Sequence, residues 1–301
     1  MTNNQYIEKV LASQNLATDS AELETVQSHR ADVEKLLLKH FAKSHPTIRY
    51  GGSIAKGTLI KEAYDLDMIC YFENDDTTAG DTLKEIYENT EAALQADYLV
   101  ERKTSALRLK SKAKDQFGLD FHIDVVPGRY TNEGKDDAYI YQASAEKCRL
   151  KTNLETHINY IKGSGVVDAI RLMKLWRERN GLRIKTFALE LLTIELLKSK
   201  KSDTFATQLE HIWTELKENV DSITIEDPAN PTGNDLSELL NASVKQALSL
   251  VATSTLNLIE TNGWEAVFGP VEEVNKQQRV HSLRQAAATV TNPNRPWGNS
   301  K

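Results

Sequence analysis

Apolar residues recur at helical spacing over the first forty residues of the chain, in stripes at 6–11 and 26–41. Residues three and four positions apart share one face of a helix, so both stripes predict amphipathic helices. His45-Pro46 ends the second helix, because the residue before a proline disfavours helical backbone angles.

Short apolar segments that are typical of strands come next. The pattern predicts strands at 48–52, which runs into a turn, and at 66–72, 98–112 and 119–126, with a helix at 82–95. Between Pro127 and Pro228 the chain has no proline, and helical patterns replace the strands. They lie near 150–162, 166–180, 186–199 and 204–219, and a further one near 236–261.

These elements predict an α+β protein with two lobes. Residues 1–150 would form the N-terminal helix and a mixed sheet with flanking helices, and residues 151–288 a C-terminal helical lobe. An active site is expected in the cleft between the lobes. The segment 289–301 contains two prolines and three asparagines and is expected to be a flexible tail.

The composition is that of a globular protein. The 301 residues include 37 basic and 43 acidic side chains, for a net charge of −6, and 40% are hydrophobic. No apolar run approaches the roughly 18–20 residues of a membrane span, and the N-terminus has no signal-peptide pattern. Cys70 and Cys148 form no CxxC pair, so a cytoplasmic location without disulfides is expected. The acidic balance gives no general attraction to nucleic acid.

The most informative segment runs from Gly51 to Thr58. Gly51-Gly52 allows a tight turn and a close approach to a ligand, and a short helix after it would aim backbone N–H groups at an anion. Phosphate is the usual anion at such a turn, and the Ser53 hydroxyl adds a donor.

Three carboxylates are candidates for one cation site. Asp65 and Asp67 alternate on a strand, so both side chains leave the same face and repel each other unless a cation lies between them. Asp124 lies on the polar face of the strand predicted at 119–126 and is the third candidate. Oxygen ligands beside phosphates suit Mg²⁺ or Mn²⁺, and three carboxylates can hold two ions for in-line phosphoryl transfer.

Each motif also has an ordinary structural interpretation. A Gly-Gly-Ser segment is often only a turn, an Asp-x-Asp segment a solvated strand end, and Asp124 an edge residue. Arg108, Lys110 and Lys112 alternate along a predicted strand, where they would either line a nucleotide groove or form a charged strand edge. Taken together, the turn, the carboxylate pair and the third carboxylate favour a catalytic site.

The motifs resemble those of the DNA polymerase β-like nucleotidyltransferase superfamily. The matching segments are Gly52-Ser53-x-x-x-Gly57-Thr58, Asp65-x-Asp67 and Asp124-Val125-Val126-Pro127. The segments 170–176 (IRLMKLW), 187–192 (FALELL) and 225–234 (IEDPANPTGN) resemble helical-lobe motifs of the oligoadenylate synthetase-like branch. Its bacterial members are the cGAS/DncV-like nucleotidyltransferases (CD-NTases) of CBASS anti-phage systems.

The resemblance implies a metal-dependent nucleotidyltransferase with a polymerase β-like lobe. Asp65, Asp67 and Asp124 would be the catalytic and metal-binding residues, and the cofactor would be two Mg²⁺ ions, with Mn²⁺ as a substitute. The residues that would bind nucleotide are Gly52, Ser53, Lys56, Arg171, Lys174, Thr186 and Phe187. Of these, Lys174 would contact the triphosphate and Phe187 would stack on a base.

The implied reaction joins NTPs, ATP among them, into a cyclic di- or trinucleotide or a short oligonucleotide, with release of pyrophosphate. The product would be a second messenger of anti-phage defence, and the expected partners are regulatory or effector proteins of the same system. A nucleic-acid activator and a membrane are not expected. Two alternatives stay open: a nucleotidyltransferase that modifies tRNA, a protein or a small-molecule hydroxyl, and a binding protein without activity. The motifs leave the bases, the linkage and the ring size undetermined.

Overall fold

The computed structural model describes residues 1–15, 21–63, 66–112, 122–143 and 148–271. The chain divides into two compact units, Met1–Gly269 and Pro270–Lys301, and all elements below belong to the first unit. Asp65, the first residues of the strand predicted at 119–126, and the tail at 289–301 lie outside the described residues. The lobe boundary near residue 150 and the tail therefore stay predictions.

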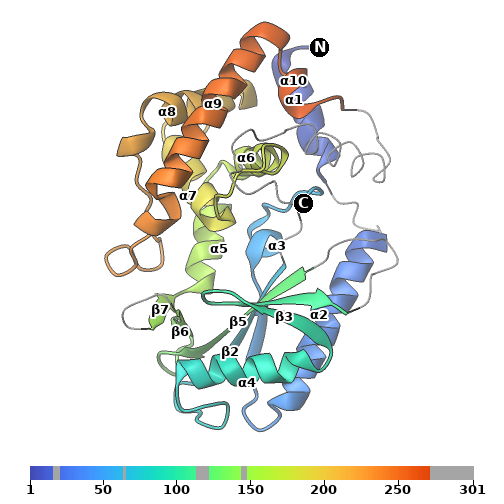
Figure 1. The fold of residues 1–301 in the computed structure, drawn as a ribbon, viewed down its shortest axis with the longest axis vertical. Coiled ribbons are helices and arrows are strands. Elements are labelled where there is room, and N and C mark those ends of the chain that lie inside the picture. The colour runs from blue at the N-terminus through green and yellow to red at the C-terminus, as the bar shows by residue number, and fades with distance from the viewer. Residues whose placement is uncertain (16–20, 64–65, 113–121, 144–147, 272–301) are drawn as a thin grey trace, which may run out of the picture. The chain divides into compact units, whose positions relative to one another are not determined.

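Within the described residues, seven strands form one mixed sheet (Figure 1). The order is β1-β2-β5-β4-β3, and β6 pairs with the later part of β5 and with β7. Strands β2 and β5 are parallel, and the other described pairs are antiparallel. The strands are β1 (Thr47–Tyr50), β2 (Leu66–Phe72), β3 (Tyr98–Arg102), β4 (Leu107–Ser111), β5 (His122–Tyr130), β6 (Ala138–Tyr141) and β7 (Arg149–Thr152).

Successive side chains of β2 point to opposite faces of the sheet. Met68, Cys70 and Phe72 are fully buried in a core shared with α2 (Ala21–His40) and α4 (Leu83–Gln95), the helices near the sheet in Figure 1. Burial raises the pKa of the Cys70 thiol, as expected for a side chain in this core. Because successive strand residues point to opposite sides, Asp67 lies on the other face.

The chain after the sheet is helical. Trp176 and Trp213 are buried there, with ring centroids 5.9 Å apart, as core residues. The helices are α5 (Leu154–Lys162), α6 (Val167–Arg179), α7 (Thr186–Leu196), α8 (Phe205–Glu218), α9 (Ala242–Asn262) and α10 (Glu265–Phe268), with short 3-10 turns at Val220–Ser222 and Ser237–Leu240.

The first helix packs with this helical part rather than with the sheet. Helix α1 (Asn3–Ser13) begins at a capping box formed by Thr2 and Gln5, and it contacts α6 and α8. The Tyr6 hydroxyl donates to the Gly269 carbonyl at 2.6 Å. The short helix α3 (Gly52–Lys56) lies between β1 and β2 and contacts both β2 and α5.

The α+β class and most predicted elements are confirmed, and strand β2 has the predicted bounds. Several predictions differ in detail: strand β5 continues to Tyr130, and the helix predicted near 150–162 begins at Leu154, after strand β7. The segment 98–112 is a hairpin, because the Lys103 N–H bonds the Ala106 carbonyl at 2.8 Å and turns the chain back. Strands β6 and β7 are not predicted at all. The helix at 236–261 begins later, at Ala242, because Asn241 caps it through the Val244 N–H.

Among the described residues, no helix combines the length and apolar character needed to cross a bilayer.

Candidate active site

The glycine turn after β1 packs directly on the start of β2. Gly51 donates its N–H to the Asp67 carbonyl at 2.9 Å, and Gly52 begins α3 with a positive φ of 65°. The turn closes at Gly57, which has a φ of 76°, and the Thr58 N–H bonds the Ser53 carbonyl at 2.8 Å. Both glycines occupy backbone conformations that other residues adopt only with strain.

Gly52 and Asp67 are in close contact. A Cβ atom added to Gly52 would lie 2.1 Å from Asp67 Oδ2 and 2.9 Å from Asp67 Cγ. No side chain fits in that space, so glycine is required both for the backbone angle and for the approach of the carboxylate. The predicted phosphate turn therefore touches a predicted catalytic aspartate.

Asp67 and Asp124 are direct neighbours across the sheet. They are register partners in the parallel pair β2–β5, so both side chains leave the same face. Adjacent strands lie about 4.8 Å apart, which places the two carboxylates beside each other. Asp65 lies outside the described residues, and among the described residues no cluster of three or more His, Cys, Asp or Glu side chains forms a metal site. The structure therefore brings together two of the three predicted carboxylates.

Arg108 pairs with Asp124. Its Nε donates to Asp124 Oδ1 at 2.8 Å and its Nη2 donates to Oδ2 at 2.7 Å. Strand β4 lies between β3 and β5, so the interpretation of Arg108 as part of a charged strand edge is wrong. The guanidinium belongs to the carboxylate face of the sheet.

The segment after the glycine turn is held by α6. Lys174 is fully buried and donates from Nζ to the Thr58 carbonyl at 2.9 Å, while Arg171 Nε donates to the Leu59 carbonyl at 3.2 Å. A second arm of Arg171 donates to Asn15 at 2.6 Å. These contacts fix the chain that leads from the turn toward β2. The binding of triphosphate by both residues stays a prediction.

Glu190 joins α7 to the same turn from inside the protein. Its buried carboxylate accepts from Lys56 Nζ at 2.8 Å and from the Thr58 hydroxyl at 2.7 Å. A buried carboxylate is stable only when it is paired and hydrogen-bonded, and here both conditions are met. Lys56 is thus bonded to a residue far along the chain, and its predicted binding of nucleotide stays a prediction.

Replacing Glu190 tests this connection. We expect Glu190→Gln to lower the free energy of unfolding by about 2–3 kcal/mol, because Lys56 loses its anionic partner in a buried setting. The same change on the same helix at Glu195, which forms an exposed pair with Lys198, should cost less than about 0.5 kcal/mol. Urea denaturation of both variants measures the difference, and equal losses would mean that the buried pair adds nothing.

Phe187 lies in a small cluster at the start of α7. Its ring centroid is 4.7 Å from that of His157, and Lys56 Nζ lies 5.2 Å from the ring centroid. The neighbouring Thr186 hydroxyl accepts from Arg177 Nη1 at 2.8 Å. Lys56 and Phe187, both predicted to bind nucleotide, are therefore close together, while their contacts with a nucleotide stay predictions.

Asp227 orients His157 and is a residue that the motif analysis did not assign to the site. Its Oδ1 lies 2.6 Å from His157 Nε2, and its Oδ2 accepts from Asn234 at 2.7 Å. Burial alone would raise the pKa of Asp227, but the hydrogen bonds from His157, Asn234 and the Ala229 N–H outweigh it and hold the pKa below its usual value. Asp227 and Asn234 both lie in the segment at 225–234. The resemblance of that segment to a family motif is the sequence signal that could have identified them.

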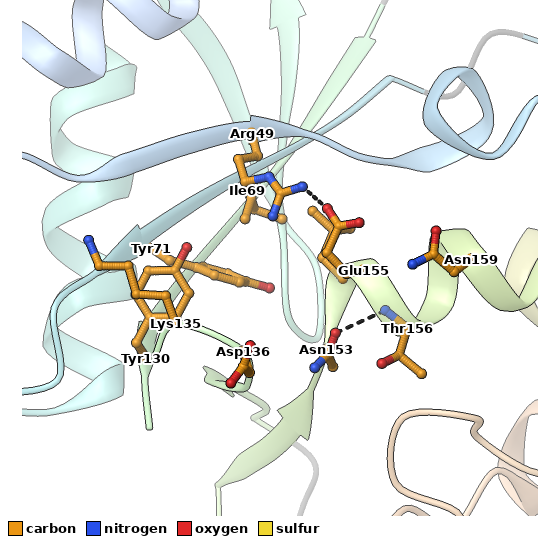
Figure 2. Close-up of a pocket in the computed structure, with 11 residues that line it drawn as sticks. Arg49, Ile69, Tyr71, Tyr130, Lys135, Asp136, Asn153, Glu155, Thr156 and Asn159 are labelled. Atoms are coloured by element: carbon orange, nitrogen blue, oxygen red, sulfur yellow. Dashed lines mark hydrogen bonds and ion pairs between the residues drawn. The ribbon is translucent and has the colours of Figure 1, made fainter. Parts of the chain in front are cut away.

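A pocket opens on the carboxylate side of the sheet (Figure 2). Ile69 and Tyr71 follow Asp67 on the same face of β2, about 7 and 13 Å along the strand at 3.3 Å per residue. The cavity measures about 240 Å³, and Arg49 and Glu155 form an ion pair beside it. Burial raises the pKa of Tyr71, whose hydroxyl end points toward the middle of the pocket in Figure 2.

The first turn of α5 forms the opposite side of this pocket. Asn153 caps the helix by accepting from the Thr156 N–H at 2.9 Å, and Thr156 and Asn159 line the cavity with it. Amide and hydroxyl groups on one side and an aromatic ring on the other are suited to a planar ligand with polar edges.

The chain is similar to known proteins in its sequence and in its fold. No protein-family model matches the chain. The cyclic AMP-AMP-AMP synthase of Escherichia coli (strain MS 115-1) is 23% identical, over 77% of this chain and 86% of that protein. The structure of CdnC from E. coli MS115-1 with ATP matches with a TM-score of 0.66 and 19% identity, over 91% of this chain and 99% of that one. Vibrio cholerae DncV cyclic AMP-GMP synthase with a linear intermediate matches with a TM-score of 0.58 and 16% identity, over 92% and 88%.

The fold is thus that of the DNA polymerase β-like nucleotidyltransferases. The sequence of this chain is similar to that of a cyclic AMP-AMP-AMP synthase, and the solved structures that share its fold include CD-NTases. The family resemblance found in the motifs is confirmed. Transfer to tRNA, protein or a small-molecule hydroxyl is not favoured by these relatives.

Proposed function

We propose that the protein joins NTPs into a cyclic di- or trinucleotide, or a short oligonucleotide, that acts as a second messenger. The observation that carries this proposal is the contact between the glycine turn at Gly52 and Asp67, with Asp124 next to Asp67 in register. The E. coli relative is a cyclic AMP-AMP-AMP synthase, and a related structure contains ATP, which supports ATP as one substrate.

In the proposed reaction, a ribose hydroxyl of one NTP attacks the α-phosphorus of another. The new bond joins that oxygen to the α-phosphorus, the bond from the α-phosphorus to the oxygen bridging to the β-phosphate breaks, and pyrophosphate leaves. Asp124 accepts the proton of the hydroxyl. The turn at Gly52 and Ser53 holds the outgoing phosphates. The protein therefore accelerates the reaction mainly by orienting the substrates.

We propose two Mg²⁺ ions as cofactor, with Mn²⁺ as a substitute. Asp67 and Asp124 offer carboxylate oxygens side by side on one face, and the absence of a side chain at Gly52 leaves room for the first of them. Hard divalent cations prefer such oxygen ligands. We assign Asp65 as the third ligand from the motif. When bound, the two ions supply neutralisation of the charge on the phosphates.

Mass spectrometry of the products tests the proposed function. The purified protein is incubated with all four NTPs and Mg²⁺, treated with phosphatase, and the nucleotide products are identified. We expect a phosphatase-resistant cyclic product, or a short oligomer, that contains adenosine. Labelled nucleotide attached to RNA or to protein instead, or no product with any NTP, would refute the proposal.

The pocket beside Ile69 and Tyr71 is our proposed site for the base of the second nucleotide. A nucleotide whose reacting end lies at Asp67 extends along the strand toward Tyr71, where Thr156 and Asn159 can bond the edge of its base. We expect Asn159→Ala to change the ratio of bases in the product about three- to tenfold, the value of one lost hydrogen bond. Lys162→Ala, an exposed change on the same helix, should leave the ratio unchanged. Competition among the four NTPs, with product analysis, measures the ratio, and an unchanged ratio in Asn159→Ala would exclude this pocket.

A regulatory protein partner is also proposed. CdnC of E. coli MS115-1 has been solved in a CdnC:HORMA-deltaN complex, which supports a partner of this kind for the present chain. The cytoplasmic location stays a prediction.

A further inference from the structure

Arg108, Asp124 and Asp67 form one row across three neighbouring strands. Arg108 is directly opposite Asp124 in the antiparallel pair β4–β5, and Asp124 is the partner of Asp67 in the parallel pair β5–β2. Glu101 continues the row on β3, opposite Arg108. Residues in register on adjacent strands share a face, so Arg108 has a carboxylate residue on each side of it in this row, Asp124 on β5 and Glu101 on β3.

The contact between Arg108 and Asp124 engages the whole carboxylate. Both oxygens accept a hydrogen bond, at 2.8 and 2.7 Å, in the two-pronged geometry that guanidinium and carboxylate form best. The side chains are 27% and 19% exposed, so the pair is shielded from water more than a surface ion pair. The two Asp124 oxygens that are proposed to bind a cation are thus already paired with a positive charge of the protein itself.

We propose that Arg108 keeps the cation site weak until a nucleoside triphosphate arrives, so that the metal ion and the triphosphate bind together. This inference rests on the proposed function, which assigns Asp67 and Asp124 as cation ligands. Arg108 opposes a lone divalent cation in two ways, because its positive charge repels the ion and its N–H groups occupy both oxygens of Asp124.

A triphosphate removes this opposition. Its phosphate oxygens offer the guanidinium a second anion with the same bidentate geometry, and they bring negative charge to the row. Asp124 is then released toward the cation. In thermodynamic terms, Arg108 creates a positive coupling between the binding of metal and the binding of triphosphate.

The test is a titration of the full-length protein with Mn²⁺, followed by electron paramagnetic resonance of the free ion. Without nucleotide, we expect Arg108→Gln to bind Mn²⁺ about three- to tenfold more tightly than wild type, the effect of removing one nearby positive charge. With a saturating non-hydrolysable ATP analogue, the two proteins should bind Mn²⁺ with nearly equal affinity. Lys110→Gln is the matched control, since Lys110 lies two residues along the same strand and pairs with Glu101 at 3.5 Å.

The outcomes separate the inference from the proposed function. Unchanged or weaker Mn²⁺ binding by Arg108→Gln, or an equal gain in Lys110→Gln, overturns the role of Arg108. If wild type binds no Mn²⁺ even with the analogue, the proposed function fails, and this inference with it. Should Arg108→Gln not fold, Arg108→Lys replaces it: it keeps the charge and loses the two-pronged contact, so an affinity between those expected for the other two proteins supports the inference, and an affinity equal to or below that of wild type overturns it.

Discussion

Asp67→Asn should reduce product formation from NTPs by at least about a hundredfold while the protein stays folded. The substitution keeps the size of the side chain and removes the charge that stands next to Asp124 in the sheet. Charged groups that are already in position around the transferred phosphoryl group commonly raise the rate by two or more orders of magnitude. Initial rates of pyrophosphate release, with circular dichroism as the check on folding, measure the effect.

The control for this prediction is Asp32→Asn, the same chemical change on the exposed side of α2. It should leave the rate within about twofold of wild type, because surface substitutions away from a site rarely matter. Binding of a fluorescent NTP analogue should weaken in Asp67→Asn far less than the rate falls, since the glycine turn is unchanged. If Asp67→Asn turns over NTPs at a rate near that of wild type, Asp67 is not catalytic.

Gly52→Ala should cause the second largest loss of activity, and comparison with Gly57→Ala shows the reason. Both glycines have positive φ, 65° and 76°, so each substitution costs about 1–2 kcal/mol of backbone strain. At Gly57 the new Cβ would meet nothing nearer than Val167 at 3.9 Å, whereas at Gly52 it would lie 2.1 Å from Asp67 Oδ2. Only Gly52→Ala must therefore displace the carboxylate.

We expect similar midpoints of thermal unfolding for the two alanine variants but very different activities. A shift of about 1 Å in a catalytic group can lower a rate a hundredfold, so Gly52→Ala should be about that much slower than Gly57→Ala. Steady-state rates at saturating NTP give the comparison. Equal activities would mean that the contact between Gly52 and Asp67 has no part in catalysis.

The sequence predicts the carboxylate face well because its signal is local. Alternation in β2 and β5 fixes which residues leave each face, and the register of the parallel pair, which only the structure shows, then brings Asp67 and Asp124 together. The hairpin of β6 and β7 escapes prediction because each strand has only four residues, too few for a clear period.

The environment of basic side chains is harder to predict. The alternation of Arg108 with Leu107 and Leu109 is the same in an edge strand and in an interior strand. Only the pairing of β4 with β5 shows that Arg108 faces Asp124. In the same way, the sequence does not show that Lys174 is buried, because its acceptor, the Thr58 carbonyl, lies 116 residues away in the chain.

The two contacts that join Lys56 and Thr58 to Glu190 constrain how this protein can be recombined with its relatives. A chimera that takes residues 1–152 from this protein and the remainder from a relative would pair the glycine turn with a foreign α7. Unless positions 56, 58 and 190 are exchanged as a set, the hybrid would contain a buried charge without its counterpart. To change the substrate pocket, it is therefore better to replace the residues on one side of the pocket than to exchange whole lobes with a relative.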